Sequence, residues 1–278
     1  MKQLFDKVSV GCSKLTTKAY STSFSLGIRF LGRDLHDPVY SIYGFVRFAD
    51  EIVDTLHDYN KEELLSEFKR DTWVAIDRKI SANPILNSFQ FVVNKYNIER
   101  ELIDSFFRSM EADLNLSVHS AQSYNDYIYG SAEVVGLMCL RVFTDNDDAL
   151  YQKLKYPAMK LGAAFQKVNF LRDIKADYLL LGRTYFPGVN FNCFSDDDKA
   201  KIQREIDHDF DEALAGIREL PVPSRRGVYL AYYYYRKLFL MIKKTPPEHV
   251  MNMRIRIPNY KKLGFMCKSF LRHQLNLL

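Results

Sequence analysis

Residues 161–187 read LGAAFQKVNFLRDIKADYLLLGRTYFP. Four polar side chains recur in this stretch at intervals of three, four and four residues: Gln166, Asn169, Asp173 and Asp177. On an α-helix this spacing places them on a single stripe, whereas the flanks of the stripe are apolar. Because burying unpaired polar or ionised groups is costly, the stripe must face solvent, cations of a neighbouring helix or a polar cavity.

A second acidic helix is predicted at residues 47–54, RFADEIVD, where Asp50 and Asp54 share a face and Arg47 lies one turn earlier. Alone, this pattern fits a solvated acidic face or an Arg–Asp pair as well as a metal site. Two such helices facing each other would present hard oxygen ligands suited to Mg²⁺, with a diphosphate as the third party. Donors for phosphate oxygens lie beside these carboxylates: Arg47, Arg172 and Arg183.

The rest of the chain also has helical patterning. Only 12 glycines and 9 prolines interrupt it, and apolar residues recur at spacings of three and four. We therefore predict an all-α protein. The expected helices cover residues 38–57, 61–80, 85–95, 99–117, 123–143, 147–181, 196–218, 225–243 and 258–275.

The length allows one large domain or two small ones with a substantial core, and because no composition shift marks a linker we expect one domain over residues 1–278. The four cysteines form no C-x-x-C pair, so neither a zinc site nor a disulfide framework is indicated, and a cytoplasmic location fits best. No apolar run is long enough to span a membrane. The net charge of +5 is modest and gives no reason to expect nucleic acid as a partner. The basic cluster at 254–268 suits an anionic substrate, an anionic membrane surface or a solvated tail.

Two further patterns bear on function. The chain holds 20 Phe and 18 Tyr; most should pack in the core and on the surface, and the others would line an apolar cavity in which ring faces stabilise a carbocation. A di-iron carboxylate bundle would also use facing acidic helices, but it requires Glu-x-x-His on two of them. That pattern is missing from the sequence.

The 161–187 stretch resembles a signature of the squalene/phytoene synthase family. The matching residues are Leu161-Gly162, Gln166, Asn169-Phe170-Leu171-Arg172-Asp173, Asp177 and Arg183-Thr184-Tyr185-Phe186-Pro187. Residues 127–136, YIYGSAEVVG, are similar to the family's other signature, Tyr-Cys-x-x-Val-Ala-Gly-x-Val-Gly. Here Ile128, Ser131 and Glu133 depart from the pattern, which leaves the shape of the cavity near this helix open.

Other segments carry the resemblance across nearly the whole chain. Residues 20–25, YSTSFS, are similar to the Ser-x-Ser-Phe segment that lies beside the diphosphate in relatives, although such clusters also cap helices. The segment 110–114, MEADL, is more like phytoene synthases than squalene synthases. The resemblance implies substrate contacts by Ser21, Ser23, Phe24, Tyr43, Val135, Gln166, Asn169, Arg183, Tyr235 and Arg254.

The family's fold is a helical bundle around a central apolar cavity, as in other isoprenoid synthases, and its reaction joins two prenyl diphosphates head to head. The resemblance implies Mg²⁺ as the cofactor, with Mn²⁺ as an alternative cation. The implied ligands are Asp50, Asp54, Asn169, Asp173 and Asp177, and the implied catalytic residues are the four aspartates with Arg47, Tyr127 and Arg172. Ionisation of one donor would lead through a cyclopropyl diphosphate to the 1-1′ linked product.

Phytoene synthase acting on geranylgeranyl diphosphate is the preferred reading, and a squalene or dehydrosqualene synthase acting on farnesyl diphosphate is the alternative. NADPH would be needed only for squalene. A terpene cyclase or chain-elongating transferase is more remote, because Asp-Asp-x-x-Asp is absent. A non-catalytic assembly factor is disfavoured because all four aspartates are present. We expect a monomer or homodimer in the cytoplasm, with a peripheral contact at the inner face of the membrane left open as a route for releasing a hydrophobic product.

Overall fold

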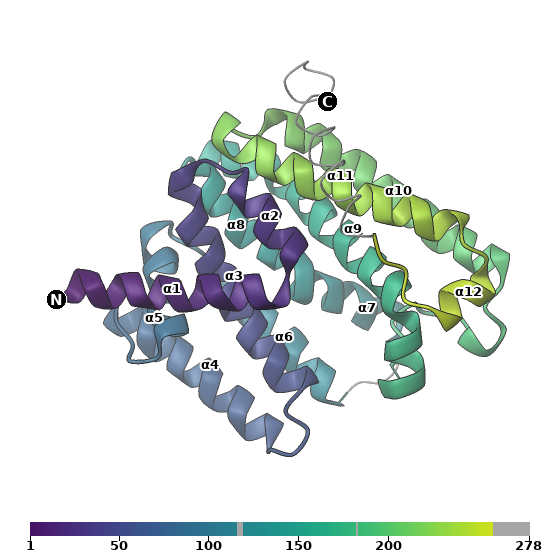
Figure 1. The fold of residues 1–278 in the computed structure, drawn as a ribbon, viewed down its shortest axis with the longest axis horizontal. Coiled ribbons are helices and arrows are strands. Elements are labelled where there is room, and N and C mark those ends of the chain that lie inside the picture. Colours follow the sequence, from purple (N-terminus) through teal and green to yellow (C-terminus); the bar gives the residue numbers. More distant parts are fainter. Residues whose placement is uncertain (116–118, 182, 258–278) are drawn as a thin grey trace.

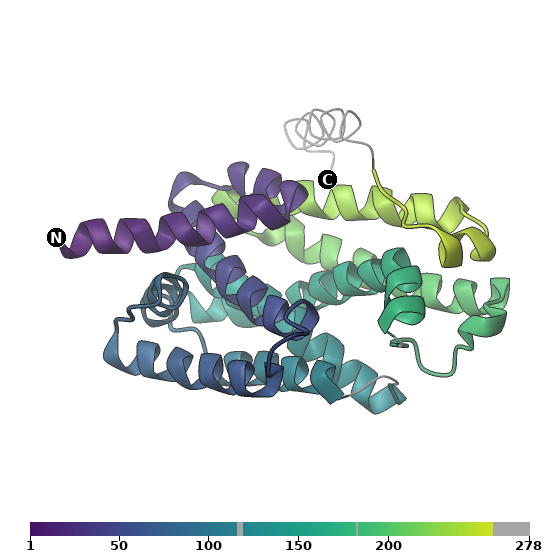
Figure 2. The same cartoon turned by 60° about the horizontal axis from the view of Figure 1, so that its bottom comes forward.

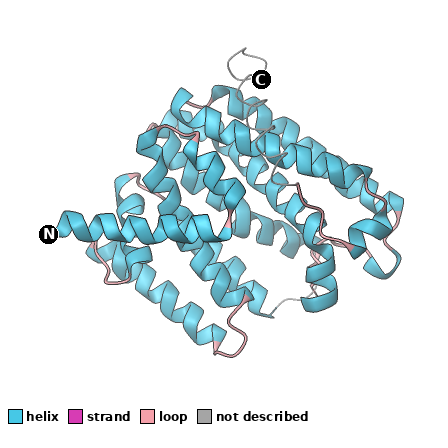
Figure 3. Ribbon diagram, in the orientation of Figure 1, coloured by secondary structure: helices cyan, strands magenta, loops and turns pink. Residues whose placement is uncertain are grey.

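The computed structural model describes residues 1–115, 119–181 and 183–257, except for the side chains at 176, 177, 179–181 and 192. Within these residues the chain forms helices and no strand (Figure 3). The α-helices are α1 (Lys2–Tyr20), α2 (Thr22–Arg29), α3 (Arg33–Asp54), α4 (Lys61–Arg78), α5 (Pro84–Lys95), α6 (Arg100–Asn115), α7 (Ala121–Ile128), α8 (Val134–Thr144), α9 (Asp148–Leu181), α10 (Asp196–Glu219), α11 (Val222–Lys244) and α12 (Pro247–Asn252). A π-helical turn, η1 (Tyr129–Glu133), joins α7 to α8, and a short 3₁₀ turn, η2 (Phe191–Cys193), precedes α10. The all-α prediction is confirmed.

The long helix α9 organises the bundle. It packs against α10 and α11 on one side and against α8 and η1 on another. Figure 1 shows α10 and α11 running together along one edge, whereas α1 and α3–α6 make up the other half. Turning the molecule shows α1 lying on the outside, with its N-terminal half extending beyond the bundle (Figure 2). Helix α9 therefore lies between the two halves and packs against helices on both sides.

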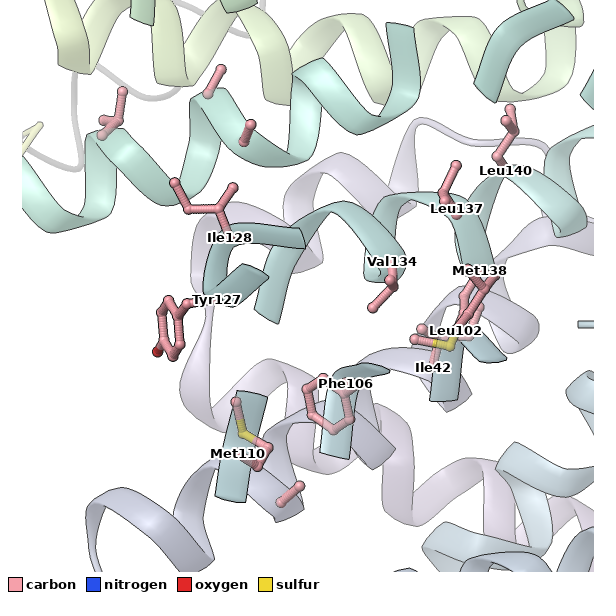
Figure 4. Close-up of a cluster of buried hydrophobic side chains, with 14 of the residues drawn as sticks. Ile42, Leu102, Phe106, Met110, Tyr127, Ile128, Val134, Leu137, Met138 and Leu140 are labelled. Carbon is pink, nitrogen blue, oxygen red and sulfur yellow. The ribbon is translucent and has the colours of Figure 1, made fainter. Parts of the chain in front are cut away.

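The main core lies between α3, α5, α6 and α8. The rings of Phe45 and Phe89 stack with centroids 3.8 Å apart. Phe106 and Met110 of α6 face Val134 at the start of α8 (Figure 4). All five side chains are buried, so this packing fixes where α3 ends relative to the rest of the bundle.

Several helix ends follow from local sequence. Ser195 and Asp198 form a reciprocal capping box at the start of α10, which satisfies backbone N–H groups that have no partner within the helix. Asn83 accepts from two backbone N–H groups of α5, and Pro84 occupies its first turn. These signals explain why the predicted starts at 85 and 196 agree with the observed ones to within a residue.

Two predictions at the N-terminus were wrong. No helix was expected before residue 38, yet α1 and α2 cover most of that region and α3 begins at Arg33. Pro38 lies inside α3, near enough to its start that the missing N–H removes one early backbone bond without ending the helix. Helix α1 has no apolar stripe toward the core, because the residues it buries are Ser9, Ser13 and Thr17.

The helix predicted at 123–143 is interrupted by η1, which splits it into α7 and α8. At Gly130 a Cβ would lie 2.0 Å from Ser109 Oγ, so only glycine permits this approach to α6. At Gly162 a Cβ would lie 2.7 Å from the carbonyl oxygen of Ala132. The π turn is thus held tightly between α6 and α9, where such irregular turns often accompany functional sites.

The described helices include none that is both long enough and apolar enough to cross a membrane. The helix predicted at 258–275, most of the basic cluster and Cys267 lie outside the described residues.

Candidate active site

A cavity of about 540 Å³ lies between α2, α3, α8, α9, α10 and α11. Its apolar lining includes Leu31, Phe143, Leu154, Ile217 and Leu220. Small residues on several helices, such as Ala158, Ala213 and Ala231, leave the space open. The polar lining residues are Tyr20, Ser21, Tyr43, Arg47, Ser131, Gln166, Asn169, Arg172, Tyr235 and Arg254. The expected central apolar cavity is therefore present, and it carries three arginines.

Arg47 is held in place on α3 by three contacts. Its guanidinium donates to Asp50 Oδ2 at 2.5 Å and also to the Glu51 carboxylate, and it lies 4.3 Å from the centroid of the Tyr20 ring. Its Nε is buried and has no partner within the described part of the chain. Because Arg47 lines the cavity, a pre-positioned donor is available there for an anionic ligand.

The two aspartates of α3 have different surroundings. Burial and the nearby charge of Asp54 together raise the pKa of Asp50 to about 6, against the lowering effects of Arg47 and Arg183. Asp54 instead accepts from Arg183 Nη1 at 3.0 Å. Arg183 also donates to the backbone carbonyl of Asp113 at 2.9 Å. Arg183, predicted to bind substrate, thus ties the chain after α9 to the end of α3.

Asp173 on α9 lies between two arginines. It accepts from Arg172 Nε at 3.0 Å and from Arg254 Nε at 2.6 Å. Both arginines line the cavity, so the carboxylate orients two cations toward the same space. Asp177 follows one turn later on α9, but its side chain is outside the description.

The two amides of the α9 stripe also reach this space. Asn169 Oδ1 accepts from the Tyr235 hydroxyl at 3.4 Å, and Gln166 Nε2 donates to Ser131 Oγ at 3.5 Å. All four residues line the cavity. The part of the stripe that lines the cavity, Gln166 and Asn169, therefore covers about one helical turn, with Arg172 beside it.

Residues of the N-terminal segment divide between the cavity and the helix cap. Ser21 lines the cavity and accepts from the backbone N–H of Phe24 at 3.2 Å, so it also caps α2. The Phe24 and Tyr43 rings lie 4.9 Å apart in the cavity wall. Val135 lines the cavity as expected. Ser23 is half-buried and does not contribute to the described lining, so its substrate contact stays a prediction.

Tyr127 does not contribute to the described lining of the cavity. It is buried, and its hydroxyl donates to Asp113 Oδ2 at 2.7 Å. Its ring lies 5.3 Å from Tyr185 and 5.1 Å from His119. Figure 4 shows Tyr127 beside Ile128 at one end of the core shared with Phe106. A catalytic role for Tyr127 stays a prediction.

Sequence reasoning missed the cluster around Tyr127. Burial raises the pKa of Asp113 to about 7, and its Oδ1 has no partner among the described residues. His119 Nδ1 is likewise buried without a described partner, and burial lowers the His119 pKa. The 110–114 segment contained a signal for Asp113, whereas His119 lies in no recognised motif.

The described residues include ligands of the kind that Mg²⁺ takes, but they do not form a metal cluster by themselves. No three His, Cys, Asp or Glu side chains in the described structure converge to hold a metal, and each described aspartate of the pattern meets an arginine: Asp50, Asp54 and Asp173. Mg²⁺ commonly binds through one or two carboxylates plus substrate phosphate oxygens. The carboxylates and the Asn169 amide oxygen are hard ligands of the required kind. Asn169 lines the cavity, whereas Asp50, Asp54 and Asp173 are not among its described lining residues, although α3 and α9 both contribute to the wall.

An all-α bundle of this kind, with an apolar cavity between its helices, is the architecture of isoprenoid synthases. A dehydrosqualene synthase crystal structure superposes with a TM-score of 0.82 over 98% of both chains, at 20% identity. Squalene synthase HpnC from Alicyclobacillus acidocaldarius superposes with a TM-score of 0.76 over 86% of this chain and 94% of that one, also at 20% identity.

The model of the squalene/phytoene synthase family matches residues 17–261. The 4,4′-diapophytoene synthase of Staphylococcus haemolyticus is 24% identical over 88% of this chain and 90% of its own length. The chain belongs to the squalene/phytoene synthase family, whose members condense prenyl diphosphates head to head.

Proposed function

We propose that this chain is a magnesium-dependent phytoene synthase that joins two molecules of geranylgeranyl diphosphate. The observation that carries the proposal is the pairing of Arg47, Arg172 and Arg254 with carboxylates at the wall of one apolar cavity. An amphiphilic diphosphate needs both environments, because its isoprenoid chain must leave water while its phosphates require cationic donors. Similarity to phytoene synthases supports the choice of product.

In the first step the arginines would hold the diphosphate of one donor as its C1–O bond breaks. Arg47 is oriented by Asp50 and Glu51, and Arg172 and Arg254 are oriented by Asp173. Donors fixed in advance in a site shielded from water stabilise the departing charge strongly. Bound magnesium would neutralise that charge further; Asp50, Asp54, Asn169, Asp173 and Asp177 are the residues proposed to hold it.

The second step needs a dry cavity. The double bond of the second prenyl diphosphate attacks the allylic cation, and loss of a proton closes a cyclopropane. A second ionisation and rearrangement then give the 1-1′ linkage, and another proton is lost to form phytoene. Water would capture either cation, so the apolar walls serve to exclude it. The faces of Phe24, Tyr43 and Phe165, which line the cavity, suit a neighbouring cation.

The alternative product is squalene or dehydrosqualene from farnesyl diphosphate. It is favoured by similarity to the staphylococcal 4,4′-diapophytoene synthase. The proposed product, phytoene, is favoured by similarity to the 15-cis-phytoene synthase of Synechocystis, which is 26% identical over 95% of this chain and 84% of its own length. The head-to-head step is common to both readings. Only the length of the bound chains and the fate of the final cation differ.

The test is a product assay on the purified full chain. It is incubated with Mg²⁺ and either geranylgeranyl or farnesyl diphosphate, with and without NADPH, and the hydrocarbons are identified by mass spectrometry. We expect phytoene from geranylgeranyl diphosphate without NADPH, loss of turnover with a chelator, and recovery on adding Mg²⁺ or Mn²⁺. Squalene or dehydrosqualene as the main product would select the alternative. A cyclic terpene, or no hydrocarbon from either substrate, would contradict the proposed reaction.

A further inference from the structure

Helix α1 lies on the surface, but it buries small polar side chains and exposes large apolar ones. The fully buried residues of its packing face are Ser9, Ser13 and Thr17, and Cys12 beside them packs partly on the core. Ser13 Oγ forms a hydrogen bond of 2.7 Å with Ser88 Oγ, and Asn87 donates to Ser9 Oγ at 3.1 Å. The helix is therefore attached through small hydroxyl side chains, and its larger apolar side chains are left to face outward.

The outward face of α1 carries an apolar row. Leu4, Val8 and Leu15 are 67%, 54% and 70% exposed, and their spacing of four and seven residues places them on one stripe. Phe5, beside the stripe, is 39% exposed. Between them Gly11 has open space around it. Surface helices of soluble proteins usually direct such residues to the core. Among the described residues, no side chains cover this apolar row.

Lysines follow one edge of this row. Lys7, Lys14 and Lys18 recur at intervals of seven and four, which places them on a second stripe beside the first. Lys7 and Lys18 are exposed, whereas Lys14 is half-buried with its Nζ 5.5 Å from the ring of the buried Tyr40. Asp6, the acidic residue of α1, accepts instead from Lys2 at 2.7 Å and from Asn87 at 3.2 Å. The outward face is therefore apolar and positively charged.

We propose that this face, Leu4, Val8 and Leu15 flanked by Lys7, Lys14 and Lys18, binds the surface of an anionic lipid bilayer. An apolar stripe edged by lysines is the pattern of a helix that lies in the membrane interface, with leucines among the acyl chains and ammonium groups at the phosphates. A second copy of this chain is the competing occupant. Two copies of this face would bring lysine rows together without acidic residues to meet them, whereas a bilayer matches both the apolar and the charged parts.

The position of α1 gives such binding a consequence for the cavity. The helix ends at Tyr20, which lines the cavity together with the adjoining Ser21. In Figures 1 and 2, α1 runs from this end along the side of the molecule, and its N-terminal half extends beyond the bundle. A bilayer bound along α1 would thus lie close to the Tyr20 side of the cavity. The binding itself rests on the surface of α1 and stands whichever substrate the cavity takes.

The test is flotation of the purified full chain with lipid vesicles in low salt. Vesicles of phosphatidylcholine containing about one quarter phosphatidylglycerol are compared with pure phosphatidylcholine. We expect binding to the anionic vesicles that weakens as salt is added. No binding to the anionic vesicles would overturn the proposal.

Two variants locate the surface. Lys7→Gln combined with Lys14→Gln and Lys18→Gln should weaken binding by about tenfold or more, since each lysine near such a surface contributes about fivefold. The control Lys79→Gln, Lys201→Gln and Arg204→Gln removes the same charge from exposed positions elsewhere, and should change binding less than about twofold. Equal losses in both variants would mean attraction by net charge alone and would overturn the proposal.

The second variant, Leu4→Gln with Val8→Gln and Leu15→Gln, should abolish most binding while circular dichroism and the melting temperature stay unchanged, because these side chains face outward. Light scattering on the same samples examines the competing occupant. If the wild type is a dimer that this variant converts to a monomer, and vesicles do not bind, the face belongs to a second copy and the lipid proposal fails.

Discussion

Helix α9 carries two groups of ion pairs on different faces. Toward α10, Lys160 and Lys167 meet Asp209 at 3.1 and 2.6 Å. Toward the cavity, Asp173 meets Arg172 and Arg254. We call the first set, Lys160, Lys167 and Asp209, the inner group, and the second set, Arg172, Asp173 and Arg254, the outer group. The Lys167 and Asp209 side chains of the inner group are only 6% and 2% exposed. The arginines of the outer group line the cavity.

The difference separates charges that hold the fold from charges that await a ligand. Buried ions are tolerated only when fully paired, and Lys167 also meets the Glu205 carboxylate. The inner group therefore fixes α9 against α10. The outer group leaves its arginines facing the cavity, where they can still donate hydrogen bonds to a ligand. Substitutions in the two groups should accordingly affect different measurements.

The largest effect is expected in the outer group and on α3. Asp50→Asn or Asp173→Asn should lower turnover of geranylgeranyl diphosphate by about 10³-fold, because each removes a proposed metal ligand and the charge that orients an arginine. Circular dichroism and the melting temperature should stay close to wild type. Steady-state product formation measures turnover. Full activity in either variant would show that the substituted aspartate is not part of the site.

The inner group should respond in the opposite way. Lys167→Met leaves Asp209 with one fewer partner in a buried position, which should cost about 3–5 kcal/mol of unfolding free energy. Turnover below the melting range should stay within a few-fold of wild type. Urea denaturation compares this variant with Lys201→Met, an exposed control on α10. Equal stability of the two variants would show that the inner group does not hold the fold.

A smaller effect that depends on pH is expected at Glu133, which faces the lysines of the inner group from η1. Burial raises the pKa of Glu133 to about 7, against the lowering effect of Lys160 and Lys167. The folded state then holds a proton that the unfolded chain releases, so unfolding free energy should fall as pH rises from about 4.5 to 7.

The variant Glu133→Gln removes this titration. It should be near neutral at pH 5 and more stable than wild type at pH 8, by at most about 3 kcal/mol. Thermal denaturation at the two pH values measures it. A stabilisation that is the same at both pH values would show that Glu133 is ionised in the folded protein throughout.

The smallest effect is expected at Tyr235. Its hydroxyl donates to Asn169 Oδ1 over 3.4 Å, a long neutral hydrogen bond worth about 1 kcal/mol or less. Tyr235→Phe should keep the ring stacked on Phe165 at 4.0 Å and reduce kcat by less than tenfold. A loss as large as that of Asp173→Asn would mean that the hydroxyl acts directly on substrate.

The α9 part of the outer group was predictable from the sequence, whereas the inner group was not. Asp173 lies on one helix with Gln166 and Asn169 at fixed intervals, so periodicity alone places them on one stripe. Arg254 was expected only from the family resemblance. Lys167 and Asp209 are separated by a long stretch of chain, and their pairing depends on how α9 packs on α10. No local sequence pattern predicts how the two helices pack.

The same limit explains the other errors in the fold. Helix α1 buries hydroxyl groups, so a search for apolar periodicity passes over it. The π turn η1 depends on the close approach of α6 and α9 at Gly130 and Gly162, which is a tertiary contact. Asp113 is set beside Tyr127 by the same packing.

A labelling experiment tests most directly whether the cavity joins two prenyl diphosphates at their first carbons. Geranylgeranyl diphosphate carrying carbon-13 at C1 is converted by the wild-type chain with Mg²⁺, and the product is analysed by carbon NMR. We predict phytoene enriched at the two carbons joined at its centre and at no others. Label at an ordinary head-to-tail junction, or in a cyclic terpene, would contradict it.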